Sequence, residues 1–245
     1  MDFNVSDELK SVQELARQIL ADFSEVEQLK AFDSTAERID RKLWQALAEA
    51  GLLGVDIAAN HGGMEMGFYA LATLCEEVGR TVAPAPVVPV LVAASTLARF
   101  GTETQKDQWL PGVAAGSTLL TLGLDEYIND QPANPGATAT NEGDGYRISG
   151  TKTCVPVARA SQRILLTAKA GDELVLALVD PQADGVTLNA QVVTSGETRH
   201  EVVLDNVAVT AQDVVATGDD AVTAVNWAEQ ATRVALCASA TGLCD

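Results

Sequence analysis

Residues 142–151 read EGDGYRISGT and predict a point at which the chain folds back on itself as a β-hairpin. Glycines on both sides of Asp144 are typical of a tight turn, because glycine readily adopts the positive φ that hairpin turns require. The segments before and after this turn have compositions that suit short β-strands. We therefore expect an antiparallel pair of strands here, with further strands on either side of it.

Short segments rich in Leu, Val and Thr lie around this hairpin and are separated by turn residues. Residues 125–136 contain Asn129, Pro132, Pro135 and Gly136, a composition that predicts a loop. Several strands at such close spacing predict a small antiparallel sheet or barrel. The expected strands cover residues 118–124, 146–151, 163–168, 174–179 and 200–204.

The chain before residue 117 has the pattern of helices instead. Apolar residues recur at helical spacing between Leu9 and Phe23, and Ser6 is a plausible start for that helix. A second helix is expected to stop at Gly51 and a third to close at Gly79, because glycine favours the left-handed conformation that ends many helices. Further helices are expected over residues 87–100, after a capping box at Thr102 and Gln105, and from about residue 211 to the end of the chain.

The order of these segments predicts an α+β protein in which helices and strands form separate domains. We expect an N-terminal all-α domain over residues 1–116 and a small antiparallel β-barrel domain over residues 117–212. Residues 213–245 are expected to be the first helix of an incomplete C-terminal helical domain. Such a helix, ending with the chain, is expected to leave part of its apolar face uncovered.

The composition excludes several classes of function. The chain has 245 residues, of which 47% are hydrophobic, so it can form a folded core. Its formal net charge of −18 repels phosphate backbones and anionic lipids, so we expect neither nucleic-acid binding nor membrane binding. We expect no secretory signal in residues 1–20 and a cytoplasmic protein.

The four cysteines do not suggest a metal centre or a redox pair. Cys75, Cys154, Cys237 and Cys244 show no CxxC spacing and have no histidine nearby in the sequence. Free thiols in a reducing compartment are the simplest interpretation. For Cys154, a structural thiol is favoured over a reactive one, since Lys152 is its only basic neighbour in the sequence.

Five stretches together resemble the acyl-CoA dehydrogenase family. Residues 40–54 read DRKLWQALAEAGLLG and residues 61–67 read HGGMEMG. Residues 76–80 (EEVGR), 100–106 (FGTETQK) and 143–153 (GDGYRISGTKT) follow in the order and at the separations expected of that family. Each motif alone is weak, but five in order are specific.

This resemblance implies a fold and an activity. It implies an N-terminal helical domain, a middle β-barrel and a C-terminal four-helix domain of which this chain carries only the first helix, so that the C-terminal domain is truncated. It also implies FAD as cofactor, an acyl-CoA thioester as substrate, α,β-dehydrogenation as reaction and electron-transfer flavoprotein as redox partner. Assembly as a homo-oligomer, or as a hetero-oligomer with another acyl-CoA dehydrogenase subunit, is expected as well.

The same resemblance places the flavin against two segments. In the first the family has a Thr-Glu-Pro run, of which only Glu126 is matched here. In the second the family has an aromatic residue and a threonine, where this chain has cysteine and proline; cysteine cannot stack as an aromatic ring does, and proline has neither a hydroxyl nor an N–H. The predicted cofactor-binding residues are Leu122, Leu124, Asp125, Cys154, Val155 and Pro156.

No catalytic residue is predicted. The dehydrogenation needs a carboxylate that removes the α proton of the thioester. Where some members place that carboxylate on the helix that begins their C-terminal domain, this chain has Thr232, which cannot act as such a base. Glu229 lies one helical turn earlier and is interpreted as a solvated surface residue.

Three functions stay open from the sequence. The first is an acyl-CoA dehydrogenase that is inactive as an isolated chain of this length. The second is the non-catalytic subunit of a heteromeric acyl-CoA dehydrogenase, and the third is a cofactor-free scaffold module. Lys152, Arg159 and Arg163 either attract the phosphates of CoA or FAD or are ordinary surface cations.

Overall fold

The computed structural model describes residues 6–33, 35 and 38–245, so the first five residues of the expected helical domain lie outside the described part. Helices dominate the first half of the chain and strands the second, as expected for an α+β protein. The helices are α1 (Asp7–Ala21), α2 (Val26–Asp33), α3 (Arg41–Glu49), α4 (Phe68–Thr81), α5 (Val87–Phe100), α6 (Glu103–Ala114) and α7 (Gly218–Cys244). The strands are β1 (Leu120–Gly123), β2 (Thr138–Glu142), β3 (Gly145–Pro156), β4 (Arg163–Ala170), β5 (Glu173–Val179), β6 (Val186–Gln191), β7 (Arg199–Val209) and β8 (Val214–Thr217).

Helix starts follow the polar residues that the sequence offers. The side chain of Ser6 accepts a hydrogen bond from the Leu9 N–H, and Asp40 accepts from two N–H groups at the start of α3. Thr102 and Gln105 form the expected capping box of α6. These side chains satisfy N–H groups that have no partner within a helix, which is why each helix begins there.

The expectation that α4 closes at Gly79 is wrong. The helix continues to Thr81 and ends at Val82, which adopts the left-handed conformation with a φ of 49°. Gly79 instead permits a close crossing, because a Cβ added there would lie 1.9 Å from the carbonyl oxygen of Ser239 on α7. Gly242 has the same relation to Glu76, at 1.8 Å. The two glycines let the backbones of α4 and α7 approach more closely than larger residues permit.

The predicted closed barrel is also not formed. The strands make one open sheet in the order β6-β7-β3-β2-β4-β5-β8, with β1 paired to β4. Most neighbours are antiparallel, but β1 and β2 both run parallel to β4. The expected hairpin is present, with Glu142 opposite Gly145 in the register of β2 and β3. Strands β6 and β8 lie at the two ends of this strand order, so the sheet has edge strands, which a closed barrel lacks.

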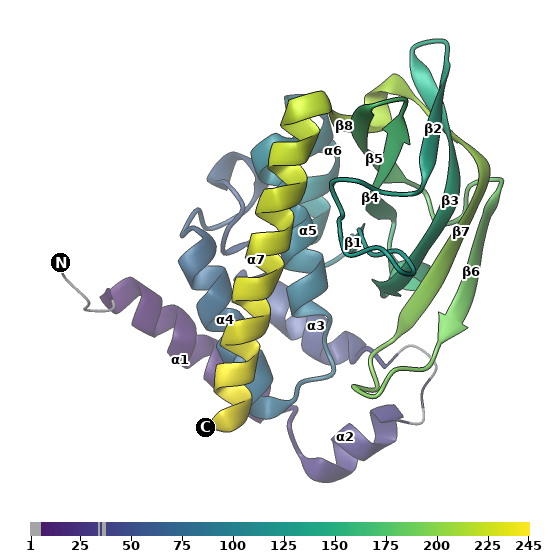
Figure 1. Cartoon of the computed structure of the whole chain (residues 1–245). Helices are drawn as coiled ribbons and strands as arrows, with labels where there is room; N and C mark the ends of the chain where they lie inside the picture. Colours follow the sequence, from purple (N-terminus) through teal and green to yellow (C-terminus); the bar gives the residue numbers. More distant parts are fainter. Residues whose placement is uncertain (1–5, 34, 36–37) are drawn as a thin grey trace.

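Helix α7 runs along α4 and α5 and also contacts β5 and β8 of the sheet (Figure 1). Its small residues are buried in the same apolar cluster as α4 and α5, including Ala224, Val225 and Ala231. Trp227 makes edge contacts with Phe68 and Phe100, at ring-centroid distances of 5.8 and 6.0 Å. Nearer the C-terminal end of the helix, Val234, Leu236 and Leu243 are exposed, as expected for this helix.

Candidate functional site

Strand β3 carries an irregularity where the predicted cofactor residues lie. Its pairing with β7 shifts register between Lys152 and Val155. Between them, Cys154 has a φ of 52°. A non-glycine residue in the left-handed region is uncommon and often accompanies a bulge. The shift returns Val155 to the buried face of the sheet and leaves the backbone of Cys154 to bond with side chains from neighbouring segments.

The residue before this irregularity is a buried cation. Lys152 is completely buried, and its Nζ donates hydrogen bonds to Glu126 Oε1 at 2.6 Å and to Thr167 Oγ1 at 3.1 Å. Burying an ammonium group without a partner costs several kcal/mol, which is why buried lysines are found paired. Lys152 is therefore part of the structure of the site and is not available to an anionic ligand in solution.

Glu126 holds the loop that joins β1 to β2. Its carboxylate accepts hydrogen bonds from the N–H groups of Gly136 (2.5 Å) and Ala137 (3.1 Å), and from the side-chain amide of Asn129 (3.2 Å). Burial alone would raise the pKa of Glu126, but the hydrogen bonds from Lys152 and from the two backbone groups outweigh it, so this pKa is lowered. The carboxylate stays ionised at neutral pH and fixes both ends of the loop.

The side chain of Gln191, at the end of β6, connects three segments. Its Oε1 accepts from the Cys154 N–H at 2.8 Å, and its Nε2 donates to Thr153 Oγ1 at 2.9 Å and to the Tyr127 hydroxyl at 3.0 Å. The carbonyl of Cys154 accepts from Arg199 Nη1 at 3.0 Å. Both backbone polar groups of Cys154 are thus bonded to side chains of this chain.

The structure brings only some of the six predicted cofactor residues together. The Asp125 carbonyl accepts from the Thr153 N–H at 2.9 Å, so the two predicted segments do meet. The side chain of Val155 is buried in the core of the sheet, and Leu122 packs against the helical core. Leu124 is half-buried, and the Pro156 carbonyl accepts from the Thr121 hydroxyl at 2.8 Å.

These residues do not fit a flavin held in the way that the resemblance implies. Cys154 provides no ring to stack on the isoalloxazine, and its N–H and carbonyl already have partners. Pro156 has no N–H, and its carbonyl accepts from Thr121. A flavin at this position would have to displace Gln191 to accept a hydrogen bond from the Cys154 N–H.

Sequence reasoning missed Gln191 and Arg199. They lie 37 and 45 residues after Cys154 in the sequence, so no local spacing connects them to it. Lys152 was grouped with two arginines as a possible surface cation, and both alternatives are wrong for it because it is buried. Arg163 lies over the Trp109 ring, 4.6 Å from its centroid, and pairs with Asp180.

The residues considered for proton transfer lie on α7. Thr232 Oγ1 donates to the Ala228 carbonyl within the helix at 2.8 Å. Glu229 forms an ion pair with Arg233, one turn further along the same helix. This pairing agrees with the interpretation of Glu229 as a surface residue, since pairs at this spacing are typical of the solvent-facing side of a helix.

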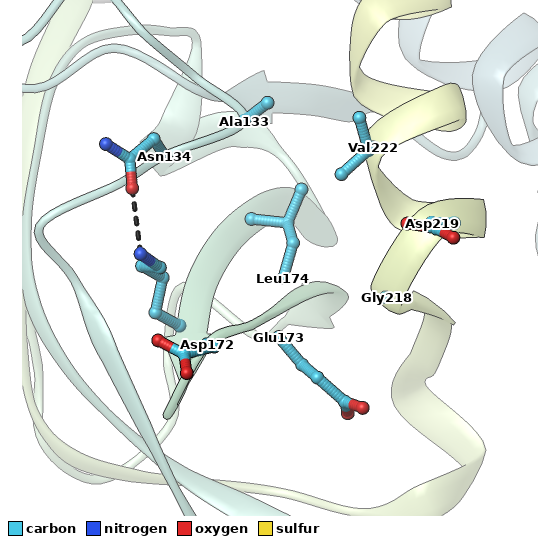
Figure 2. Close-up of a pocket in the computed structure, with 9 residues that line it drawn as sticks. Ala133, Asn134, Asp172, Glu173, Leu174, Gly218, Asp219 and Val222 are labelled. Atoms are coloured by element: carbon cyan, nitrogen blue, oxygen red, sulfur yellow. Dashed lines mark hydrogen bonds between the residues drawn. The ribbon is translucent and has the colours of Figure 1, made fainter.

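A hollow of about 380 Å³ lies between the β1–β2 loop, the β4–β5 turn and the start of α7. Lys169 Nζ donates to Asn134 Oδ1 at 2.8 Å, and the dashed line at Asn134 in Figure 2 marks this hydrogen bond. Three carboxylates line the same hollow, from Asp172, Glu173 and Asp219. With its one ammonium group bonded to Asn134 and three carboxylates around it, the hollow has an acidic lining that is unfavourable for a phosphate group.

Among residues 6–33, 35 and 38–245, no group of three or more His, Cys, Asp or Glu side chains is placed to hold a metal ion. Within the same described residues, none of the helices combines the length and the apolar character that crossing a membrane requires.

Comparison with known proteins gives the family. The family model for the N-terminal domain of acyl-CoA dehydrogenases matches residues 6–117. "Acyl-CoA dehydrogenase FadE28" of Mycobacterium tuberculosis (strain ATCC 25618 / H37Rv) is 31% identical over 197 residues, which cover 76% of this chain and 56% of that protein. The chain spans little more than half the length of the curated relatives that it matches.

Solved structures extend the match beyond the helical part. A variant of the "Tcur3481-Tcur3483 steroid ACAD" superimposes with a TM-score of 0.88 at 40% identity, over 95% of this chain and 62% of that one. The "ChsE4-ChsE5 complex from Mycobacterium tuberculosis" gives a TM-score of 0.86 at 25% identity, over 95% and 64%. Together with the helices and the mostly antiparallel sheet, these matches show that the chain belongs to the acyl-CoA dehydrogenase family of flavoprotein oxidoreductases.

Proposed function

We propose that this chain is the non-catalytic subunit of a heteromeric acyl-CoA dehydrogenase, in which another subunit carries the FAD and performs the α,β-dehydrogenation of an acyl-CoA thioester. The observation that carries this proposal is the bonding of Cys154. Gln191 and Arg199 take up its N–H and its carbonyl at the place where the resemblance puts the flavin. Cys154 has no ring to stack on a flavin, and its backbone N–H and carbonyl are bonded to side chains of the same chain. This arrangement suits a structural role better than flavin binding.

The chemistry requires groups that the described residues of this chain do not offer at the matched positions. A carboxylate must remove the α proton, donors must polarise the thioester carbonyl, and a flavin must accept the hydride. Thr232 stands at one position where family members place the carboxylate, and its hydroxyl donates back to the helix. We infer that the partner subunit supplies both the base and the flavin.

The acidic hollow supports the same assignment. CoA carries several phosphate negative charges, and Asp172, Glu173 and Asp219 would repel them. Among the similar structures, ChsE4-ChsE5 is a complex of two differently named chains, and Tcur3481-Tcur3483 joins two names in the same way. These points favour a partner that binds the substrate, with this chain completing the assembly.

A second candidate, in which this chain itself carries FAD, is favoured by one observation. Glu126, the residue that matches the family's Thr-Glu-Pro run, is held by Lys152 and keeps the β1–β2 loop folded. Backbone groups of that loop would then bind the cofactor without the Cys154 segment. A third outcome, a cofactor-free scaffold, corresponds to a stable complex in which neither subunit contains flavin.

The test is turnover by the chain alone and after co-expression with the acyl-CoA dehydrogenase subunit encoded beside it. We expect acyl-CoA-dependent reduction of an electron acceptor only by the complex. Thr232→Val and Glu229→Gln in this chain are expected to leave that rate unchanged, because neither residue takes the proton. Replacing the carboxylate base of the partner is the matched control and should abolish turnover. Turnover by the chain alone, or its loss in either of the two variants, contradicts the proposal.

A further inference from the structure

The bulge in β3 turns a backbone donor away from the strand ladder. The register of β3 against β7 shifts between Lys152 and Val155, and Cys154, with its φ of 52°, lies within that shift. The Cys154 N–H donates to the side chain of Gln191 instead of to a neighbouring strand. A bulge leaves its extra residue unpaired, so this N–H needs another acceptor.

Gln191 supplies that acceptor from a strand that is not adjacent to β3. Strand β7 lies between β6 and β3 in the sheet, and Gln191 itself is opposite Arg199 on β7. Its Oε1 nevertheless accepts from the Cys154 N–H at 2.8 Å, and its Nε2 donates to Thr153 Oγ1 at 2.9 Å and to the Tyr127 hydroxyl at 3.0 Å. Both donors of the carboxamide and its oxygen are therefore bonded, which fixes the orientation of the group.

The two groups that Gln191 joins define which other molecules fit this position. The Cys154 N–H donates and the Thr153 hydroxyl accepts, so an occupant needs an acceptor atom next to a donor atom. A carboxamide has this arrangement. The edge of a cyclic amide or imide has it as well, because a carbonyl oxygen there neighbours a ring N–H. The pyrimidine ring of a flavin has such an imide edge.

We propose that Gln191 is an autoinhibitory contact, whose carboxamide fills a position that otherwise binds the edge of a cyclic amide or imide. This inference rests on the proposed function, in which the chain carries no flavin, and it names the residue that keeps flavin out. A side chain competes well against a dissolved ligand, because a tethered group loses no translational freedom when its hydrogen bonds form.

The position remains formed without Gln191. The Cys154 carbonyl accepts from Arg199 Nη1 at 3.0 Å, and the Thr153 N–H donates to the Asp125 carbonyl at 2.9 Å. These bonds hold the backbone of both residues independently of the carboxamide. Cys154 and Gln191 are half-buried and Tyr127 is 56% exposed, so the position borders the solvent. A flat ring can therefore approach it edge-on once the carboxamide is removed.

The experiment compares Gln191→Ala with Asn189→Ala. Asn189 is a matched control, because it carries a carboxamide on the same strand two residues earlier, but its Nδ2 donates to Glu201 at 2.8 Å. Hydrogen exchange of the Cys154 amide shows first whether the position has opened. Exchange should quicken about tenfold in Gln191→Ala, since the amide loses its acceptor, and should not change in Asn189→Ala.

Binding is then measured with lumiflavin, which is the flavin ring without its phosphates, by titration followed by flavin fluorescence. Lumiflavin should bind Gln191→Ala at least about tenfold more tightly than it binds the unmodified chain or Asn189→Ala, because the competing hydrogen bonds are gone. A second probe, 3-methyllumiflavin, has a methyl group in place of the ring N–H. It should show no such gain, since it offers no donor to Thr153.

The outcomes separate this inference from the proposed function. Faster exchange without a gain in lumiflavin affinity overturns the inference, and so does unchanged exchange or an equal gain for both probes. If Gln191→Ala does not fold, Gln191→Ser is measured instead, because serine is polar and too short to reach Cys154. Stoichiometric flavin in the unmodified chain overturns the proposed function together with the inference, whereas a failure confined to the Gln191 variants overturns the inference alone.

Discussion

The buried pair of Lys152 and Glu126 gives the sharpest prediction for stability. Replacing Lys152 with methionine keeps an unbranched side chain that is one atom shorter, and removes the ammonium group. Glu126 then loses its counter-charge but keeps its hydrogen bonds from Gly136, Ala137 and Asn129. Removing one partner of a buried pair costs about 3–5 kcal/mol, and these remaining donors place Lys152→Met near the lower limit, about 3 kcal/mol.

The reverse change should cost more. In Glu126→Gln, the completely buried ammonium of Lys152 loses its charged partner and keeps only neutral acceptors, including Thr167. We expect a loss of about 4–5 kcal/mol, because a buried charge without a counter-charge is costly. The double variant, Lys152→Met with Glu126→Gln, should lose less than the sum of the two single variants, since it leaves no unpaired charge.

Urea unfolding followed by tryptophan fluorescence measures these differences. The unmodified chain, both single variants and the double variant are unfolded under identical conditions, and their midpoints and slopes are compared. A loss below about 1 kcal/mol for Lys152→Met, the size found for exposed pairs, would refute the reasoning. So would a Lys152→Met variant that is less stable than Glu126→Gln.

Three other predictions concern the rest of the chain. Hydrogen bonds from basic partners outweigh the effect of burial and lower the pKa of both Glu77 and Glu126. The ionised carboxylates therefore stabilise the folded chain above the ordinary glutamate pKa of 4.5, and this stabilisation is lost as the pH falls below that value. Thermal midpoints should fall steadily as the pH is lowered through this range, and a flat profile contradicts this. Gly79→Ala would place a methyl group 1.9 Å from the backbone of α7 and should cost about 1–3 kcal/mol or more in urea unfolding, whereas a neutral effect would show that the two helices separate freely. Burial raises the pKa of the Cys75 thiol to about 12. A thiol reagent at neutral pH should therefore label the exposed Cys237 and spare Cys75. Equal labelling of the two cysteines in the folded chain would show that Cys75 is not buried.

The sequence predicted most helices because their signals are local. Capping side chains and apolar periodicity lie within a few residues of each other, and the helix over residues 87–100 was predicted with the bounds that the structure has. Gly79 was misread because its reason lies 160 residues away, in the backbone of α7. A glycine that permits a close crossing looks, in the sequence, like a glycine that ends a helix.

The sheet was predicted less completely. Strand β6 was missed because it lies at an edge and is largely exposed, so it lacks the apolar run that marked β4 and β5. The barrel was expected from strand spacing alone, and spacing does not determine whether the first and last strands meet. The division of the chain at residues 116 and 212 stays a prediction.

The cofactor role of the six predicted residues stays a prediction. The resemblance located the two segments that meet at Asp125 and Thr153. The side chains that bond the backbone of Cys154 there are those of Gln191 and Arg199, which come from β6 and β7. Long-range hydrogen bonds of this kind leave no pattern in a single sequence, because any polar residue of suitable length at those positions reads as ordinary surface.

The flavin content of the purified chain tests the central claim most directly. The visible absorbance spectrum is recorded for the chain expressed alone, with excess FAD added and then removed, and for the complex with its partner. We predict that the chain alone shows no flavin bands and that the complex contains only the flavin carried by the partner. Flavin bands at near-stoichiometric occupancy in the chain alone would contradict the account and would show that the Cys154 segment, or the β1–β2 loop beside it, still binds the cofactor.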